Sequence, residues 1–264
     1  DSTLLSWLKP DVVVRGQLGT TNTTAQVIPA AFTRGMIEHS VSRGAECVMG
    51  NVTDIVLDRH GTAIRGIDID GKEMEANAVV IAMGPWSALA RRWLPVHDVY
   101  GLKGHSIVLR PSAPVPAEAI FADVETEDGM SDTPEIFPRP DGTVYLCGLS
   151  SQDPLPDDPS LVATASAASN QLRAIAGMLS PLLSDADTVA AQACYRPVTR
   201  DGLPVMGAMP GIEGAYIATG HSVWGILNAP ASGEALAGLI LDGQARNTDL
   251  SPFDPCRFSK AGFR

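Results

Sequence analysis

The sequence predicts an α/β fold in which a β-rich insert interrupts one α/β unit. Short, continuous apolar runs at residues 78–83 (AVVIAM) and 215–220 (AYIATG) each lead into a glycine-containing turn and a helical pattern, as buried parallel strands do. Between them, residues 101–148 contain short β-type runs separated by proline- and glycine-containing turns. A chain of 264 residues with 45% hydrophobic content can bury one large core or two smaller ones.

The first third of the chain is predicted to contain helices and a hairpin. Residues 4–10 (LLSWLKP) resemble the end of a helix that its proline stops. A second helix is expected after Pro29 and ends at Gly44; its apolar residues at helical spacing are Phe32, Met36, Ile37 and Val41. Residues 47–58 and 62–70 are rich in β-branched side chains and flank a turn-like Arg-His-Gly, so they predict a hairpin.

The middle of the chain is predicted to form a mostly antiparallel sheet. Its expected strands are residues 106–109, 120–124, 135–138 and 144–148. A helix over residues 161–183 would cover this sheet, because good helix formers occur there with helical apolar spacing. A strand at residues 189–194 then returns the chain to the run at 215–220, and the last helix is expected to begin near Ala229-Pro230.

Composition and charge exclude several classes of protein. The formal net charge of -11 opposes attraction to phosphates, so nucleic acid is not an expected partner. No apolar run approaches the roughly 18 residues that a membrane span needs. The cysteines form no CxxC pair and have no histidine at ligand spacing, so we expect no metal site and a cytoplasmic location; they are Cys47, Cys147, Cys194 and Cys256.

The segment after the last apolar run has the pattern of a ligand site. Gly220 and Gly225 bracket His-Ser-Val-Trp, and glycine lets a main chain approach a bound ring or adopt a positive φ without a Cβ clash. The helix that follows would direct its amide end toward the same ligand. This order of strand, loop and helix predicts a backbone site for a large flat ligand.

Four pieces of the chain resemble the FAD-dependent amine and amino-acid oxidases, the family of D-amino-acid oxidase, glycine oxidase and sarcosine oxidase. They are TTAQVIPAAFTRGMIEHSVSRGAE, GNVTDIV, AVVIAMGPWS, and RPVTRDGLPVMG with its sequel AYIATGHSVWGILNAPASGEALAGLI. The form TTAQVIPAAFT is similar to a poorly characterised branch of oxidoreductases. The resemblance implies FAD and a Rossmann-like FAD-binding domain at residues 1–98 and 193–264. It places a β-sheet substrate domain at residues 99–192.

The resemblance also implies which residues contact the cofactor. Backbone or side chains beside FAD would be those of Val52, Ala82, Met83, Gly84, Trp86, Gly220, Ser222, Val223, Trp224, Gly225 and Ile226. The family's first βαβ unit carries a GxGxxG loop that holds the FAD pyrophosphate, and no GxGxxG occurs in these 264 residues. We expect that loop to lie upstream.

The implied catalytic residues are Arg196, Tyr145 and Trp224. Arg196 matches a position that binds the substrate carboxylate, although an arginine before a proline is equally often an anchor for nearby carbonyl groups. Val223 stands where glycine oxidase has a second carboxylate-binding arginine. Tyr145 would face the catalytic side, where sarcosine oxidase offers a lysine, and Trp224 would pack against the ring or the substrate.

Other side chains allow two interpretations each. Cys194 matches in spacing the cysteine to which sarcosine oxidases attach flavin, and it is also interpretable as a small buried thiol. His221 could line the flavin or fill a seam between domains. His105 could point to the substrate pocket, but a surface histidine is the stronger expectation.

The family implies oxidation of a C–N bond of a small amine or amino acid by hydride transfer to flavin. One alternative is a non-catalytic or regulatory protein that retains the flavoprotein fold. A remote alternative is a serine hydrolase acting through Ser222, but the G-x-S-x-G spacing fails by one residue and no histidine follows that serine. The substrate, the electron acceptor and the oligomeric state stay open.

Overall fold

The computed structural model describes residues 5–96, 99–125, 129 and 131–258 of the chain. Its contacts divide the chain into two compact units, each assembled from two segments. Unit 1 comprises Asp1–Val14 and Gly101–Arg196, and unit 2 comprises Arg15–Tyr100 and Pro197–Arg264. Of the insert predicted at residues 99–192, residues 101–192 fall in unit 1, and Val99 and Tyr100 fall in unit 2. Leu4, in the first predicted helix, lies outside the described residues, and the segment after it forms turns.

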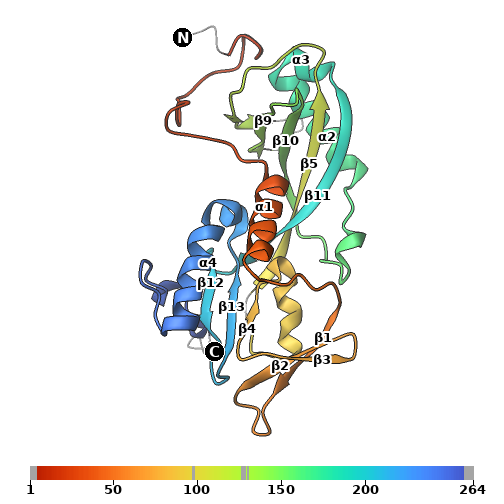
Figure 1. Cartoon of the computed structure of the whole chain (residues 1–264). Helices are drawn as coiled ribbons and strands as arrows, with labels where there is room; N and C mark the ends of the chain where they lie inside the picture. Colours follow the sequence, from red (N-terminus) through yellow and green to blue (C-terminus); the bar gives the residue numbers. More distant parts are fainter. Residues whose placement is uncertain (1–4, 97–98, 126–128, 130, 259–264) are drawn as a thin grey trace. The chain divides into compact units, whose positions relative to one another are not determined.

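Unit 1 contains a five-stranded sheet in the order β11-β5-β10-β9-β6 (Figure 1). Its strands are β5 (Val99–Arg110), β6 (Ile120–Phe121), β9 (Glu135–Pro138), β10 (Val144–Ser151) and β11 (Asp187–Thr199). The pairs β10–β5, β10–β9 and β6–β9 are antiparallel, as the sequence predicts. Short strands β7 (Val124–Glu125) and β8 (Ser131–Asp132) form a separate pair.

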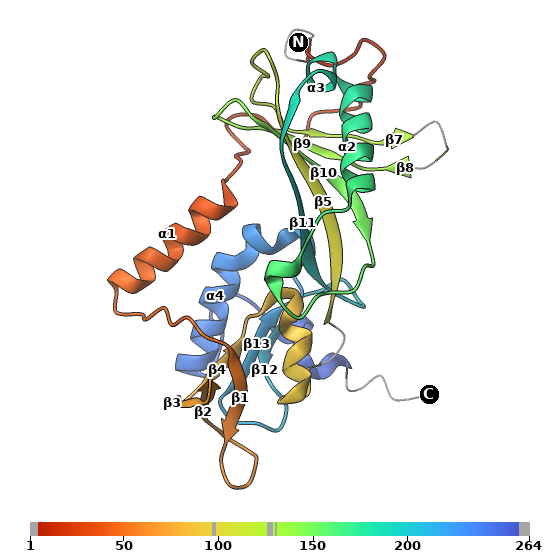
Figure 2. The same ribbon diagram turned by 90° about the vertical axis from the view of Figure 1, so that its right-hand side faces the viewer.

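One face of this sheet packs against a helix and forms the core of unit 1. Alternating strand residues are fully buried there, including Ile107, Leu109, Ile136, Val144 and Leu146. Helix α2 (Ser166–Leu179) covers them with Leu172, Ile175, Ala176 and Leu179, and Figure 2 shows it lying along the sheet. We refer to this side as the core face.

The predicted helix at residues 161–183 is wrong at both ends. Residues Pro159–Leu161 form the short 3₁₀ helix η2, and α2 begins only at Ser166. At the other end Ser180 is extended, with φ -148°, because a residue before proline is disfavoured in the helical region. The short helix α3 (Pro181–Ser184) follows, and the buried Ser180 hydroxyl donates to the Trp7 carbonyl oxygen at 2.7 Å.

Unit 2 contains two three-stranded sheets among its described residues, in the orders β1-β2-β3 and β12-β13-β4. Their strands are β1 (Val52–Leu57), β2 (Ile64–Ile69), β3 (Lys72–Glu75), β4 (Val79–Ile81), β12 (Val205–Ala208) and β13 (Ala215–Thr219). The predicted hairpin is confirmed by the antiparallel pairing of β1 and β2. The predicted parallel strands are confirmed by the pairing of β4 with β13, although only Ile81 of β4 is buried.

In unit 2 the first predicted helix agrees with the structure, the second differs from it in type and the third differs from it in its start. Helix α1 (Pro29–Ser42) is where the apolar spacing indicates it. The segment after β4 forms the 3₁₀ helix η1 (Gly84–Arg92). Helix α4 (Gly225–Asp242) begins four residues before Ala229, so Pro230 lies inside the helix, where it removes one backbone hydrogen bond. Short 3₁₀ helices η3 (Ser222–Trp224), η4 (Ser251–Phe253) and η5 (Pro255–Phe258) complete the unit.

Candidate functional site

The carboxyl ends of two parallel strands bring the predicted cofactor segments together in unit 2. Strand β4 leads into Ala82, Met83 and Gly84, and β13 leads into Gly220. The Thr219 hydroxyl donates a hydrogen bond of 2.9 Å to the Gly84 carbonyl oxygen, so the two strand-end loops lie side by side (Figure 1). In open α/β sheets this edge, at the carboxyl ends of the strands, is where ligands bind.

Both loops use backbone conformations that glycine favours. Gly84 has φ +53° and Gly220 has φ +81°. A Cβ on Gly220 would lie 2.7 Å from Cγ2 of Thr199, so a larger residue would disturb the loop. Ser222 also has a positive φ, +51°, which costs energy for a residue other than glycine and is typical of functional sites.

The amide end of α4 follows the second loop directly. No side chain caps the helix at Trp224, and α4 is 18 residues long, so its first N–H groups and its dipole can act on an anion or an electron-rich ring. Around this end, Val223, Trp224 and Leu227 are 55%, 61% and 71% exposed. Exposed apolar side chains grouped at a glycine-rich loop mark a binding surface.

Two neighbouring polar side chains have defined surroundings. The ring of His221 shares a 2.9 Å hydrogen bond between Nε2 and the Ser232 hydroxyl of α4, and burial lowers the pKa of His221. This histidine is therefore neutral at pH 7, and its Nε2 is already hydrogen-bonded to Ser232. In the described part of the chain no histidine hydrogen-bonds to the Ser222 hydroxyl, and the neighbouring His221 bonds to Ser232 instead, so the geometry gives the hydrolase alternative no support. The hydroxyl of Ser87, in η1 just after Gly84, is buried and has no hydrogen-bond partner within the described structure.

The remaining predicted cofactor residues lie at different places in unit 2. Trp86 follows Gly84 within η1, and Ile226 is the second residue of α4. Val52 begins β1 in the other sheet and pairs with Ile69. No pairing of the described strands joins Val52 to the strand-end loops, so its role as an adenine contact stays a prediction.

An ion pair that the sequence analysis missed supports the second loop. The Arg257 guanidinium pairs with Asp201 at 2.7 Å, and Asp201 also accepts hydrogen bonds from the Thr199 hydroxyl and the Leu203 amide. Arg257 and these hydrogen bonds lower the pKa of Asp201 to about 2. This turn holds Thr199 under Gly220. The residues of the pair are too far apart in the chain for spacing alone to reveal them.

Unit 1 holds the other predicted catalytic residues on the sheet face opposite the core face. Arg196 and Cys194 alternate along β11, and Tyr145 lies on β10. Burial raises the pKa of Tyr145 to about 12, so its phenol keeps its proton at neutral pH. The thiol of Cys194 is exposed, which contradicts the expectation of a small buried thiol and leaves covalent attachment of flavin a prediction.

The structure corrects the expectation of a surface histidine at residue 105. His105 is only 4% exposed and lies on the core face of β5. Its Nδ1 lies 3.3 Å from the Thr164 hydroxyl, and burial lowers its pKa. Lys103, on the same face, pairs with Asp153 at 3.0 Å. These polar groups belong to the helix-covered side of the sheet.

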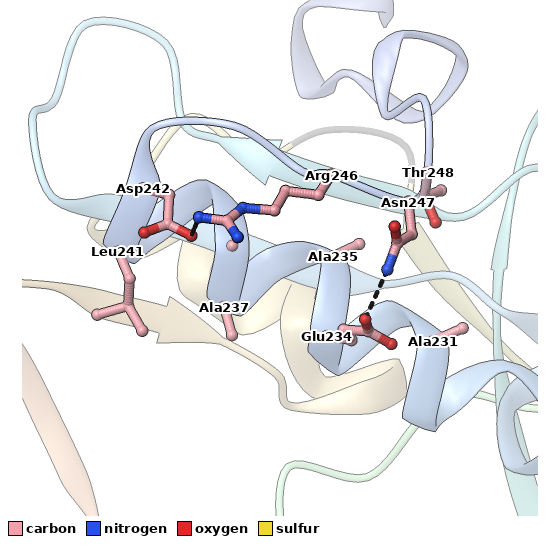
Figure 3. A pocket seen from close by; sticks show the side chains of 10 residues that line it. Ala231, Glu234, Ala235, Ala237, Leu241, Asp242, Arg246, Asn247 and Thr248 are labelled. Carbon is pink, nitrogen blue, oxygen red and sulfur yellow. Dashed lines mark hydrogen bonds and ion pairs between the residues drawn. The ribbon is translucent and has the colours of Figure 1, made fainter.

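A hollow of about 380 Å³ lies along the second half of α4 (Figure 3). Its polar side chains bind one another: Arg246 pairs with Asp242 at 3.1 Å, and the Asn247 amide donates to Glu234 at 2.8 Å. Because these groups are already paired, we assign no ligand to this hollow. Within the described residues, no helix has the length and apolar character that crossing a membrane requires.

Comparisons with known proteins agree with this geometry. The chain is 30% identical to "Putative oxidoreductase TDA3" of Saccharomyces cerevisiae, in an alignment covering 95% of the chain and 54% of that protein. It is 32% identical to glycine oxidase of Geobacillus kaustophilus, with 78% and 50% covered. The chain thus spans about half the length of the curated relatives it matches.

Solved structures of glycine oxidase and L-proline dehydrogenase are also similar to this chain. The crystal structure of the Geobacillus kaustophilus glycine oxidase superposes with a TM-score of 0.66 at 29% identity, covering 80% of the chain and 53% of that structure. L-proline dehydrogenase from P. horikoshii, at 20% identity and a TM-score of 0.72 over 89% of the chain and 61% of that structure, shares the fold. The sequence model of the family described as FAD dependent oxidoreductase (DAO) matches residues 5–239. The chain therefore belongs to the FAD dependent oxidoreductase family.

Proposed function

We propose that this protein oxidises a C–N bond of a small amine or amino acid with FAD as its cofactor. The observation that carries the proposal is the pair of strand-end loops at Gly84 and Gly220, joined by the Thr219 hydrogen bond and followed by the uncapped end of α4. Positive φ values at both glycines and exposed apolar side chains beside them suit the close approach of a flat ring.

The residues of this loop fit the ring side of FAD. When bound, FAD would accept a hydride from the substrate carbon that carries the nitrogen. The amides at the start of α4 would stabilise negative charge on the reduced ring, and the buried hydroxyl of Ser87 would gain the partner it lacks in the protein. The pyrophosphate would need a further phosphate-binding loop, since these residues contain no GxGxxG.

Arg196 would bind the substrate carboxylate. Its guanidinium makes no hydrogen bond or ion pair with any residue that the structure describes, so the alternative role as an anchor for carbonyl groups finds no support. A guanidinium with free donors is suited to a bidentate pair with a carboxylate. Trp224 would pack against the ring or the substrate.

Tyr145 and Cys147 would orient the substrate without accepting its proton. Burial raises the pKa of Tyr145 to about 12 and that of Cys147 to about 11, so both groups stay protonated at pH 7 and act as hydrogen-bond donors. We therefore expect neither group to act as a general base, and positioning to contribute more to the reaction than general-base catalysis.

The absorption spectrum of the purified protein tests this proposal. Bound flavin would absorb visible blue light, and anaerobic addition of substrate amines or amino acids would bleach the band. Bound flavin that no amine, amino acid or reduced nicotinamide bleaches would instead support the non-catalytic alternative. Acid precipitation then tests Cys194: colour that stays with the pellet indicates a covalent flavin, and colour released to the supernatant excludes it.

A further inference from the structure

The face of the unit 1 sheet opposite the core face gathers charged and aromatic side chains. Cys147 is directly opposite Ser106 on β5 and Glu135 on β9, and Tyr145 is opposite Phe137. Residues directly opposite one another in a sheet share a face. We call this side the polar face; it includes Gly104, Ser106, Val108, Phe121, Glu135, Phe137, Tyr145, Cys147, Cys194 and Arg196.

Arg196 lies at one end of the polar face and rests on a glycine. A Cβ on Gly104 would lie 2.5 Å from Nη2 and 3.2 Å from Cζ of Arg196. Glycine inside a strand often marks such a close approach. The guanidinium therefore lies across β5, and its donors have no acceptor among the described residues.

Glu135 carries the opposite charge on β9, which is separated from the Arg196 strand β11 by β5 and β10. Its carboxylate accepts a weak hydrogen bond from the Cys147 thiol, with a sulfur–oxygen distance of 3.8 Å, and pairs with no cation in the described part of the chain. Burial raises the pKa of Cys147 to about 11; the Glu135 charge raises it further and the Arg196 charge lowers it. Both charges are therefore within electrostatic reach of the same thiol.

Aromatic rings extend the polar face beyond Glu135. The rings of Phe121 and Phe137 meet edge to face at 5.8 Å, and those of Phe137 and Tyr145 are 6.4 Å apart. Phe121 is 56% exposed. The Arg139 guanidinium lies over the Tyr145 ring, 4.8 Å from its centroid, so Phe121 and Phe137 are the rings of this row that no cation covers. These two rings beside two opposite charges are complementary to a small zwitterion that carries an apolar substituent.

We propose that Glu135 is a specificity-determining residue that receives the ammonium group of an amino acid whose carboxylate pairs with Arg196. The aromatic row receives the apolar side chain of that amino acid. This inference rests on the proposed function, since it names the substrate class of the same protein. It predicts a preference for zwitterions over simple amines and over simple carboxylates.

Binding of three probes to the purified protein tests the proposal. The probes are phenylalanine, 3-phenylpropanoate, which lacks the ammonium group, and phenethylamine, which lacks the carboxylate; calorimetric titration measures their affinities. Glu135→Gln should weaken the binding of phenylalanine and phenethylamine roughly tenfold and leave that of 3-phenylpropanoate unchanged, because the ammonium group loses a negatively charged acceptor. Arg196→Gln should weaken phenylalanine and 3-phenylpropanoate and leave phenethylamine unchanged.

Two further variants separate recognition from folding. Glu125→Gln removes an exposed carboxylate of β7, outside the five-stranded sheet, and should change no affinity. Glu135→Asp keeps the charge and should recover part of the affinity for phenethylamine. The proposal is overturned if Glu135→Gln lowers the affinity for all three probes equally, or lowers the affinity for none of them. It is also overturned if the wild-type protein binds none of the probes. Flavin absorption of the same samples reports the proposed function separately.

Discussion

Helices α2 and α4 show how differently the two units use apolar sequence. In unit 1, α2 buries Leu172, Ile175, Ala176 and Leu179 against the core face of the sheet. In unit 2, the longer helix α4 buries only Ala235 and Leu236, and its first ten residues include none that is buried. The apolar side chains of α2 form a core, whereas those in the first turn of α4, Ile226 and Leu227, stay exposed beside the strand-end loops, where we propose that a ligand binds.

Helix α1, like the first half of α4, contributes no buried residue to a core. None of its residues is buried, and Met36, Ile37 and Val41 are exposed. A helix with so little tertiary contact gains little stability from packing, which in most proteins is the main source of helix stability. Unit 2 has its own core, around Ile64, Ile81 and Ile217, but α1 and the first half of α4 add nothing to it. The stability of these two segments should therefore depend on turns and bound ligand more than on core packing.

The same substitution in the two helices gives the largest expected contrast. Leu172→Ala empties a site that is fully buried and should lower the free energy of unfolding by about 2–5 kcal/mol. Leu227→Ala removes a side chain that is 71% exposed and should change it by less than about 0.5 kcal/mol. Urea unfolding of both variants measures the difference; equal losses would show that α4 has a core of its own.

Much of this difference could not be predicted from sequence. The apolar runs at residues 78–83 and 215–220 correctly indicate parallel strands, because continuous apolar runs are typical of such strands. Periodicity alone did not show whether the apolar residues of α4 face protein or ligand. The predicted start of α4 near Ala229-Pro230 is four residues late, because proline commonly occurs in the first turn of a helix and here lies further inside it.

Two glycines with the same backbone demands test the strand-end loops. Gly84, with φ +53°, and Gly61, with φ +70° in the β1–β2 turn, both have open space where a Cβ would lie. Substitution of either by alanine should cost a similar backbone strain of about 1 kcal/mol. Only Gly84→Ala should also weaken FAD binding, roughly tenfold if the lost approach costs about 1.4 kcal/mol. Flavin fluorescence during titration with FAD measures the affinity of each variant for FAD. Equal affinities in Gly84→Ala and Gly61→Ala would argue against the site.

Part of the candidate site could be predicted from the sequence, because a local backbone constraint leaves a signal in the sequence and a long-range contact does not. Gly220, which precedes residues 221–224, is a local signal, because its positive φ constrains the residue itself. Gly225, which follows them, has a helical φ of -58° and needs no such freedom. Glu135 gave no such signal, since its place on the polar face depends on the register of β9 against β10. The Asp201–Arg257 pair likewise depends on where the chain returns after α4. A glycine within β5, Gly104, was the one available hint that Arg196 lies across that strand.

The Asp201–Arg257 pair should make the stability of unit 2 dependent on pH. The folded-state pKa of Asp201, about 2, is below its ordinary value of 3.8, so the pair stabilises the protein above pH 3.8 and loses this effect as pH falls through about 2. Asp201→Asn should lower the free energy of unfolding by about 1 kcal/mol at pH 7, since partial exposure screens the pair. The difference from wild type should vanish near pH 2.

A surface pair of unit 2 provides the control for this experiment. Asp242 and Arg246 are 3.1 Å apart but are 44% and 70% exposed. Asp242→Asn should therefore change stability by less than about 0.5 kcal/mol at pH 7. A loss in Asp201→Asn no larger than in Asp242→Asn would show that the turn beneath Gly220 does not depend on its ion pair.

The smallest expected effect is a gain of stability in α1. Gly35 lies inside this helix, and nothing lies within 4 Å of the position that its Cβ would occupy. Gly35→Ala should raise the free energy of unfolding by about 0.5–1 kcal/mol, because alanine lowers the entropy of the unfolded chain and meets no neighbour. Urea unfolding followed by far-ultraviolet circular dichroism checks it. A loss would mean that another surface packs closely on α1, and the contrast between α1 and α2 would then fail.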